Sequence, residues 1–305
     1  MQDNPHRCYT AWVEIDSRTR LAAAWKQHER RWKDNRFVYA VVSRRSRGVS
    51  VGLNLNPGKE CNFHCVYCQV NRSLPPSIRK VDLEKLSDEL QLILEAEKDG
   101  SLYEADPFRV LNPSERGIRD IAFSGDGEPT TFPHFEKAVR IAAGARESFN
   151  LHGAKLVLIT NAAYLDKPSV CAALEILDQN NGEIWAKLDA GTEEYFRKVN
   201  RPNVSLEKIT GNIIGAARVR PLVIQSLWFR MNGAVPPGEE IESYCDRLNS
   251  MVSAGACLKD IQLYTIARNP SDVWAAPLSN DELDQLASMV KSRVSIPVEV
   301  YYSSI

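Results

Sequence analysis

Three cysteines close together in the chain have the types and spacing to do chemistry. Cys61, Cys65 and Cys68 lie within eight residues of a 305-residue chain that has seven cysteines in all. Random placement would give this +4 and +7 spacing in roughly 0.4 per cent of such chains. Three thiolates so spaced can converge on one point, and thiolates select iron–sulfur clusters or zinc. Three cysteines on a four-iron cluster leave one iron without a protein thiolate and therefore open to chemistry.

Two other uses of these cysteines remain open at this point. The same spacing is one face of an α-helix, where free cysteine acts as a small buried hydrophobe. Pro57 before the run and Pro75 after it argue against a helix. A zinc knuckle with His64 as the fourth ligand is the second alternative, although His64 adjoins Cys65 and the ligands do not form two separated pairs.

The bulk composition bounds the class of protein. Hydrophobic residues make up 44% and charged residues 25% of the chain, as in ordinary globular proteins. The net charge of −1 gives no bulk support for nucleic-acid binding, which usually shows as a basic domain. No apolar run is long enough to span a membrane, and the polar start does not resemble a signal peptide. Clustered cysteines in odd number are typical of a reducing compartment, so we expect a cytoplasmic protein without a membrane partner.

Short apolar runs that alternate with helical stretches must position the cysteines. The runs are rich in Val, Ile and Leu and predict strands at Val49–Asn56, Ile118–Ser124, Lys155–Asn161, Glu183–Ala190, Leu222–Arg230 and Asp260–Ala267. The stretches between them predict helices near Asp82–Lys98, His134–Ser148, Pro168–Asn180, Leu206–Ala217, Glu239–Ala254 and Asn280–Ser292. Strand–helix alternation predicts an α/β fold with a parallel sheet and right-handed crossovers. A further polar helix is predicted over Arg18–Asn35.

Polar residues follow the predicted strands at the end where parallel barrels place their active sites. The first strand leads directly into the cysteines. The second is followed by Gly125, Asp126, Gly127 and Glu128, and the two glycines would let the backbone approach a ligand closely. Asn161 ends the third strand. All five are candidate cofactor-binding residues, and the alternative for each is an ordinary turn residue.

Charged residues lie at the ends of the last three predicted strands. Lys187 and Asp189 share one strand face, because side chains alternate along a strand. Buried charges must be paired, so these two either pair with each other or contact a zwitterionic ligand. Lysine could also form a Schiff base with a keto substrate, although nothing in the sequence lowers its pKa. Arg230 and Arg268 suit carboxylate or phosphate recognition, or form surface salt bridges, and with Lys187 they are our candidate catalytic residues.

The cysteine run resembles the CxxxCxΦC signature of the radical S-adenosylmethionine superfamily, with Tyr67 at the aromatic position. The resemblance makes Tyr67 a further candidate cofactor-binding residue. The loop Gly125–Glu128 resembles that superfamily's GGE motif, which holds the amino group of S-adenosylmethionine, and Asn161 lies where its T-N-G motif has Asn. The resemblance implies a partial (β/α)6 TIM-like barrel over residues 41–305 and an N-terminal helical extension over residues 1–40. It also implies one [4Fe-4S] cluster on the three cysteines, with Lys187 toward a carboxylate and Asp189 toward ribose hydroxyls of S-adenosylmethionine.

In that superfamily an electron from the cluster cleaves S-adenosylmethionine to a 5′-deoxyadenosyl radical, which abstracts hydrogen from a substrate. The resemblance therefore implies an external one-electron donor, such as a flavodoxin or ferredoxin. We expect the substrate to be a small organic or nucleoside-like molecule. The alternatives are modification of a tRNA base, activation of a partner protein, and an iron–sulfur or zinc protein without catalytic activity.

Longer stretches resemble a narrower group of these enzymes. SRRSRGVSVGLNLNP, AFSGDGEPTTFP, WAKLDAGTEEYFRKVNRP and IQLYTIARNPSD are similar to the group related to the tRNA wyosine-base (4-demethylwyosine) synthase. That synthase uses a second cluster held by three further N-terminal cysteines. This chain has only Cys8 before Cys61, so we predict that it lacks the second cluster.

Overall fold

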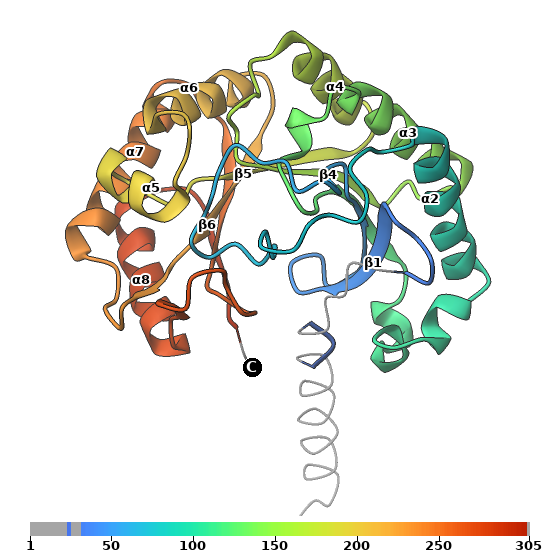
Figure 1. Cartoon of the computed structure of the whole chain (residues 1–305). Coiled ribbons are helices and arrows are strands. Elements are labelled where there is room, and N and C mark those ends of the chain that lie inside the picture. Colours follow the sequence, from blue (N-terminus) through green and yellow to red (C-terminus); the bar gives the residue numbers. More distant parts are fainter. Residues whose placement is uncertain (1–22, 26–31, 304–305) are drawn as a thin grey trace, which may run out of the picture.

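The computed structural model describes residues 23–25 and 32–303, and a curled eight-stranded sheet lies at its centre (Figure 1). Its strands neighbour one another in the order β1 (Val38–Ser43), β2 (Gly48–Leu53), β3 (Ile118–Phe123), β4 (Lys155–Thr160), β5 (Gly182–Lys187), β6 (Leu222–Leu227), β8 (Leu258–Tyr264) and β10 (Val298–Tyr301). All neighbours pair in parallel except β1, which is antiparallel to β2. The predicted α/β partial barrel is confirmed, and the six predicted strands form its middle.

Helices cover the convex face of the sheet (Figure 1). Six of them follow the predicted stretches: α2 (Leu83–Lys98), α3 (Phe135–Ser148), α4 (Pro168–Asp178), α6 (Leu206–Ala217), α7 (Gly238–Ser253) and α8 (Asn280–Arg293). Their starts are stabilised locally, as at α8, where Ser279 and Glu282 form a capping box. The sequence reading missed α5 (Glu193–Asn200), a short helix after β5.

Several shorter elements complete the described part of the chain. Strands β7 (Phe229–Met231) and β9 (Ala275–Pro277) form a separate antiparallel pair. Single 3-10 turns lie at Ser101–Glu104, Phe108–Val110, Pro113–Glu115 and Pro129–Thr131. No helix among residues 23–25 and 32–303 is long and apolar enough to cross a membrane.

Strand alternation divides the apolar residues between the two faces of the sheet. Leu156 and Leu158 of β4 belong to the main core, which lies between the sheet and the helices and includes Leu86 and Leu90 of α2. Val157, between them in sequence, belongs instead to a second, smaller cluster with Ala122, Trp185 and Val223. Two of that cluster's four residues also line a cavity that the cysteines share, so the smaller cluster covers the concave face.

Strand β1 is fixed in place by a buried carboxylate of α2. Glu89 accepts hydrogen bonds from the backbone N–H groups of Arg36, Phe37 and Val38 at 2.9, 2.7 and 3.1 Å. Strand β1 runs from Val38 to Ser43. It therefore crosses the boundary that we expected between the N-terminal extension and the barrel, after residue 40. Most of the expected N-terminal extension, including most of the helix predicted over Arg18–Asn35, lies outside the described residues.

Candidate active site

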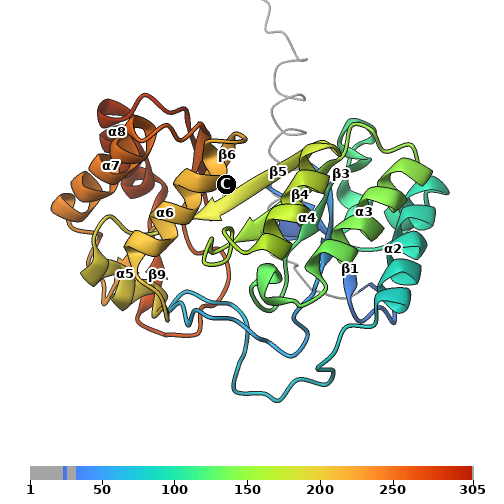
Figure 2. The ribbon, with the colours of Figure 1, turned by 90° about the horizontal axis from the view of Figure 1, so that it is seen from above.

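The loop after β2, residues 54–82, carries the three cysteines past α5 and β9 (Figure 2). We call it the cysteine loop. Its backbone is held on both sides: Val66 N–H donates to the Val199 carbonyl at 2.9 Å, and Ser271 N–H donates to the Cys68 carbonyl at 2.8 Å. The loop contains no helix, as predicted, so the cysteines are not one face of a helix packed into the core.

Cys61, Cys65 and Cys68 line one cavity of about 270 Å³ on the concave side of the sheet. Burial raises the pKa of the Cys61 thiol, and burial together with the charge of Asp189 raises that of Cys65 to about 12. Metal binding would have to displace these protons. Among the described residues, no three or more His, Cys, Asp and Glu side chains could hold a single metal ion. Thiolates of a four-iron cluster each bind a different iron, so a cluster does not require that convergence.

A buried network ties the cysteine loop to the end of β5, with Asp189 at its centre. Its Oδ2 accepts hydrogen bonds from the hydroxyl of Tyr67 and from Nδ2 of Asn200, and its Oδ1 accepts from the backbone N–H of Leu227 at 2.8 Å. Asn200 Nδ2 also lies 3.4 Å from the Cys65 sulfur. The network therefore sets the position of the loop between Cys65 and Cys68.

Lys187 pairs with Asp189 at 3.2 Å, which is one of the two arrangements that the sequence left open. Its amino group also donates to the hydroxyl of Tyr264 at 2.6 Å. Burial lowers the pKa of Lys187, but the attraction of Asp189 and Tyr264 more than offsets this, so its pKa is raised. A protonated amine is a poor nucleophile, and the site gives no support to a Schiff base at Lys187.

Glu128 and Asn161 connect the loops after β3 and β4 to the cysteine loop. The Glu128 carboxylate is buried and accepts from the hydroxyl of Thr160 at 2.6 Å and from the backbone N–H of Asn161 at 2.8 Å. The Asn161 amide in turn donates to the Asn62 side chain at 2.8 Å, next to Cys61. Glu128 thus braces the site, while both residues also line the cavity.

The two glycines predicted to approach a ligand line the cavity and also lie very close to other parts of the protein. A Cβ on Gly127 would lie 1.8 Å from the carbonyl oxygen of Glu60, and one on Gly125 would lie 2.3 Å from the Asn54 side chain. Glu60 directly precedes the first cysteine, and its carbonyl accepts from the backbone N–H of Glu128 at 3.2 Å. Glycine at 127 is therefore needed for the cysteine loop to lie against the loop after β3.

We expect Gly127→Ala to displace Cys61 and to destabilise the fold by about 1–3 kcal/mol, the usual range for overpacking. Iron content after anaerobic reconstitution should fall, measured per chain beside urea unfolding. The matched control is Gly144→Ala in α3, where a Cβ would meet nothing within 4 Å. That variant should keep its iron and be unchanged or slightly more stable. Equal iron in both variants would contradict the role assigned to Gly127.

The remaining predicted residues are not all brought together. Arg268 lines the cavity with the cysteines. Arg230 does not: it lies on β7, and its guanidinium bonds to the Glu282 carboxylate and to the Gly233 carbonyl. This is the surface salt bridge that the sequence left as its alternative. The Asp126 carboxylate accepts from the Asn54 amide at 2.7 Å, which stiffens the loop after β3.

Asn200 is the main site residue that the sequence reading missed. It lies at the last position of α5, and its amide bridges Tyr67 and Asp189. The only local signal is its place before Arg201 and Pro202, where a helix would be expected to end. Nothing in that signal indicates a contact with a cysteine 135 positions away.

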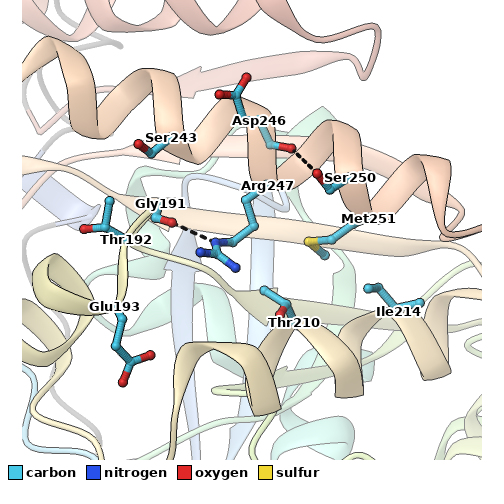
Figure 3. A pocket seen from close by; sticks show the side chains of 10 residues that line it. All are labelled: Gly191, Thr192, Glu193, Thr210, Ile214, Ser243, Asp246, Arg247, Ser250 and Met251. Carbon is cyan, nitrogen blue, oxygen red and sulfur yellow. Dashed lines mark hydrogen bonds between the residues drawn. The ribbon is translucent and has the colours of Figure 1, made fainter.

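A second hollow of about 550 Å³ lies outside the barrel, between α6 and α7 (Figure 3). Arg247 of α7 donates from Nε to the Gly191 carbonyl at 2.8 Å. Glu240 of the same helix accepts from the backbone N–H of Gly191 and from the hydroxyl of Thr192, the latter at 2.6 Å. These bonds hold the segment that follows Asp189. Helix α7 therefore supports the Asp189 network from the convex side of the sheet.

A third cavity, of about 430 Å³, lies at the opposite end of the strands and contains the carboxylate of Asp260. Burial and the charges of Glu183 and Glu299 raise its pKa from 3.8 to about 6. Because the raised value favours the protonated form, the ionised group destabilises the fold above pH 6, and this cost disappears as the pH falls toward 4. Asp260 is half exposed, so screening reduces the effect to about 1 kcal/mol.

Asp260→Asn should therefore raise the free energy of unfolding by about 1 kcal/mol at pH 7.5, and by much less at pH 4.5. Urea unfolding of both proteins at both pH values measures the difference. A gain that is the same at the two pH values would show that the ionised carboxylate carries no such cost.

Comparison with known proteins identifies the family that has this arrangement. Residues 55–224, more than half of the chain, match the sequence model of the Radical SAM superfamily. A UPF0026 protein of Helicobacter pylori strain J99 is 25% identical over 81% of this chain and 71% of its own length. A protein of Brachyspira hyodysenteriae named GTPase Obg is 26% identical over 88% of this chain. The chain spans only 35% of that relative's length.

A solved structure of TYW1 with a lysine–pyruvate adduct bound has a similar fold. The superposition covers 96% of this chain and 91% of that one, with a TM-score of 0.53 and 14% identity. At that identity the likeness concerns the fold alone. The half-barrel is therefore a fold that is already known from a solved structure.

Proposed function

Because the chain belongs to the radical SAM superfamily, we propose that Cys61, Cys65 and Cys68 hold one [4Fe-4S] cluster and that S-adenosylmethionine binds beside it. When bound, the two would supply a 5′-deoxyadenosyl radical that abstracts hydrogen from a small organic or nucleoside-like substrate. The observation that carries this proposal is the shared cavity. The three cysteines line it together with Gly125, Gly127, Glu128 and Asn161 from the loops after β3 and β4.

The chemistry of the donor set fits such a cluster. Three thiols line the cavity, and no histidine is among the described residues that line it. Cysteine thiolates are the usual ligands of iron–sulfur clusters, and three of them leave one iron for a further ligand. We infer that S-adenosylmethionine would lie against the loops after β3 and β4, because Gly125, Gly127, Glu128 and Asn161 of these loops line the cavity beside the cysteines.

The chain's own residues would orient the reactants and exclude water. Tyr67, Asp189 and Asn200 hold the cysteine loop through buried hydrogen bonds. Lys187 stays protonated beside Asp189, so it can attract a carboxylate without becoming a nucleophile. Ile159 and Trp185 give the cavity an apolar wall, which strengthens every charge interaction inside it.

We also propose an external one-electron donor, such as a flavodoxin or ferredoxin, and a location in the cytoplasm.

The other four cysteines are far apart in sequence, at Cys8, Cys171, Cys245 and Cys257, so they do not form a second cluster motif. The wyosine-type reaction is not part of the proposal, since it needs such a motif and the net charge of −1 gives tRNA binding no support.

The proposal is tested on anaerobically reconstituted protein that is reduced with dithionite and mixed with S-adenosylmethionine. We expect 5′-deoxyadenosine, detected by mass spectrometry, and measurable binding of S-adenosylmethionine by equilibrium dialysis. A protein with a full cluster that neither binds S-adenosylmethionine nor forms 5′-deoxyadenosine would contradict the proposal. It would favour an iron–sulfur protein without catalytic activity.

A further inference from the structure

Three residues form a floor between the cysteine cavity and the cavity at the opposite end of the strands. Arg45, Asp120 and Trp185 line both the upper cavity of about 270 Å³ and the lower one of about 430 Å³. They come from the turn between β1 and β2, from β3 and from β5. The upper cavity lies between this floor and the cysteine loop, and no role has yet been assigned there to Arg45 and Asp120.

The guanidinium of Arg45 is a cation that lines the upper cavity from the turn between β1 and β2. Its guanidinium carbon lies 5.3 Å from the ring centroid of Trp185 and 5.4 Å from that of Tyr264. Such stacking holds the guanidinium by its face and leaves its N–H groups at the edge. No hydrogen bond or ion pair of Arg45 occurs within residues 23–25 and 32–303. A stacked guanidinium with unused donors suits a carboxylate, which it can bind with two parallel hydrogen bonds.

Asp120 offers an acceptor beside it. The residue is 2% exposed, and its Oδ1 accepts from the Ser50 hydroxyl at 2.5 Å. Its Oδ2 is buried and has no hydrogen-bond partner in the described part of the chain. A buried polar atom left unpaired destabilises the fold, and such atoms are rare in folded proteins. An oxygen kept in this state at the wall of a cavity indicates a group that a ligand supplies.

We propose that this floor is a substrate subsite for a small organic acid that also carries a hydroxyl or amino group. Arg45 binds the carboxylate of the acid, and Asp120 Oδ2 accepts a hydrogen bond from the O–H or N–H. The inference rests on the proposed function, because the upper cavity is where the radical would act. It places the acidic end of the substrate at the floor and the reacting carbon toward the cysteine loop.

The subsite also replaces one part of the sequence-based expectation. The sequence pointed to Arg230 and Arg268 for recognition of an anion. Arg230 is engaged by Glu282 outside the cavity, whereas Arg45 lines it. Arg268 and Arg45 therefore both supply a cation to the cavity, and Arg45 does so from the turn in the stretch SRRSRG, for which the sequence predicted no role.

The experiment titrates three probes into cluster-loaded protein that holds S-adenosylmethionine, with isothermal calorimetry as the readout. The probes are glycerate, propionate, which lacks the hydroxyls, and glyceramide, which lacks the charge. We expect glycerate to bind roughly tenfold or more tightly than glyceramide, since a charge-assisted pair contributes most of the affinity. We expect it to bind about fivefold more tightly than propionate, which cannot donate a hydrogen bond to Asp120 Oδ2.

Two variants separate the two contacts. Arg45→Met should remove the advantage of glycerate over glyceramide, and the isosteric Asp120→Asn should reduce its advantage over propionate. The control Arg140→Met removes an exposed arginine of α3 on the convex side and should leave all three affinities unchanged. Each variant's fold is checked by circular dichroism before titration.

The outcomes distinguish this inference from the proposed function. If S-adenosylmethionine binds but glycerate does not, or if glycerate binds equally well to Arg45→Met, the subsite is wrong and the proposed function stands. If the cluster-loaded protein does not bind S-adenosylmethionine but still binds glycerate as expected, the floor is an acid-binding site and the proposed function fails. Loss of glycerate binding in Arg140→Met would show a nonspecific charge effect and would also overturn the subsite.

Discussion

Cys65→Ser should fold but bind almost no iron after anaerobic reconstitution, against about four irons per wild-type chain. The change replaces a soft thiolate by a hydroxyl of similar shape, which iron–sulfur clusters rarely accept. The surrounding hydrogen bonds can survive, since Asn200 can donate to the new oxygen as it does to the sulfur. Iron analysis and the visible spectrum measure the loss, and formation of 5′-deoxyadenosine should disappear with it.

The matched control is Cys171→Ser. Cys171 is an exposed cysteine of α4 whose thiol donates to the Leu165 carbonyl at 3.3 Å, on the helical side of the sheet. A serine there can make the same hydrogen bond, so iron content and stability should stay close to those of the wild type. Full iron in Cys65→Ser would rule that residue out as a ligand, and equal losses in both variants would indicate damage during reconstitution.

Asp189→Ala should lower the free energy of unfolding by about 3–5 kcal/mol, the usual cost of breaking a buried ion pair from one side. The variant leaves the partly buried ammonium of Lys187 without its partner. It also removes the acceptor of Tyr67, Asn200 and the Leu227 N–H. Urea unfolding measures the stability, and faster hydrogen exchange in the cysteine loop should accompany the loss.

Asp178→Ala serves as the control for removing one carboxylate. Asp178 pairs with Arg220 at 2.8 Å near the surface, with its side chain 38% exposed. Exposed pairs of this kind contribute at most about 1 kcal/mol. A loss in Asp189→Ala no greater than that of the control would show that the network does not hold the cysteine loop.

The six predicted strands were readable because each contains a run of buried residues. Runs such as LVLI in β4 are continuous, which is typical of parallel strands covered by helices. Strands β1 and β10 were missed for a different reason. They lie at the edges of the sheet, and β10 has only four residues, too few for its period to stand out.

The cysteine run, the glycine loop and the alternation of strands and helices are local patterns, and the sequence by itself determined the family, the half-barrel and the residues proposed to bind the cluster. The partners of buried polar groups were decided only by the tertiary structure. Asp189 accepts hydrogen bonds from Tyr67 and Asn200, which are 122 and 11 positions away in the chain. Arg230 bonds to Glu282 outside the cavity, and Arg45 stacks on Trp185 from the turn between β1 and β2. Pairing of this kind depends on which strand ends and loops the curled sheet brings together. The periodicity of the sequence does not indicate which residues far apart in the chain become neighbours in the fold.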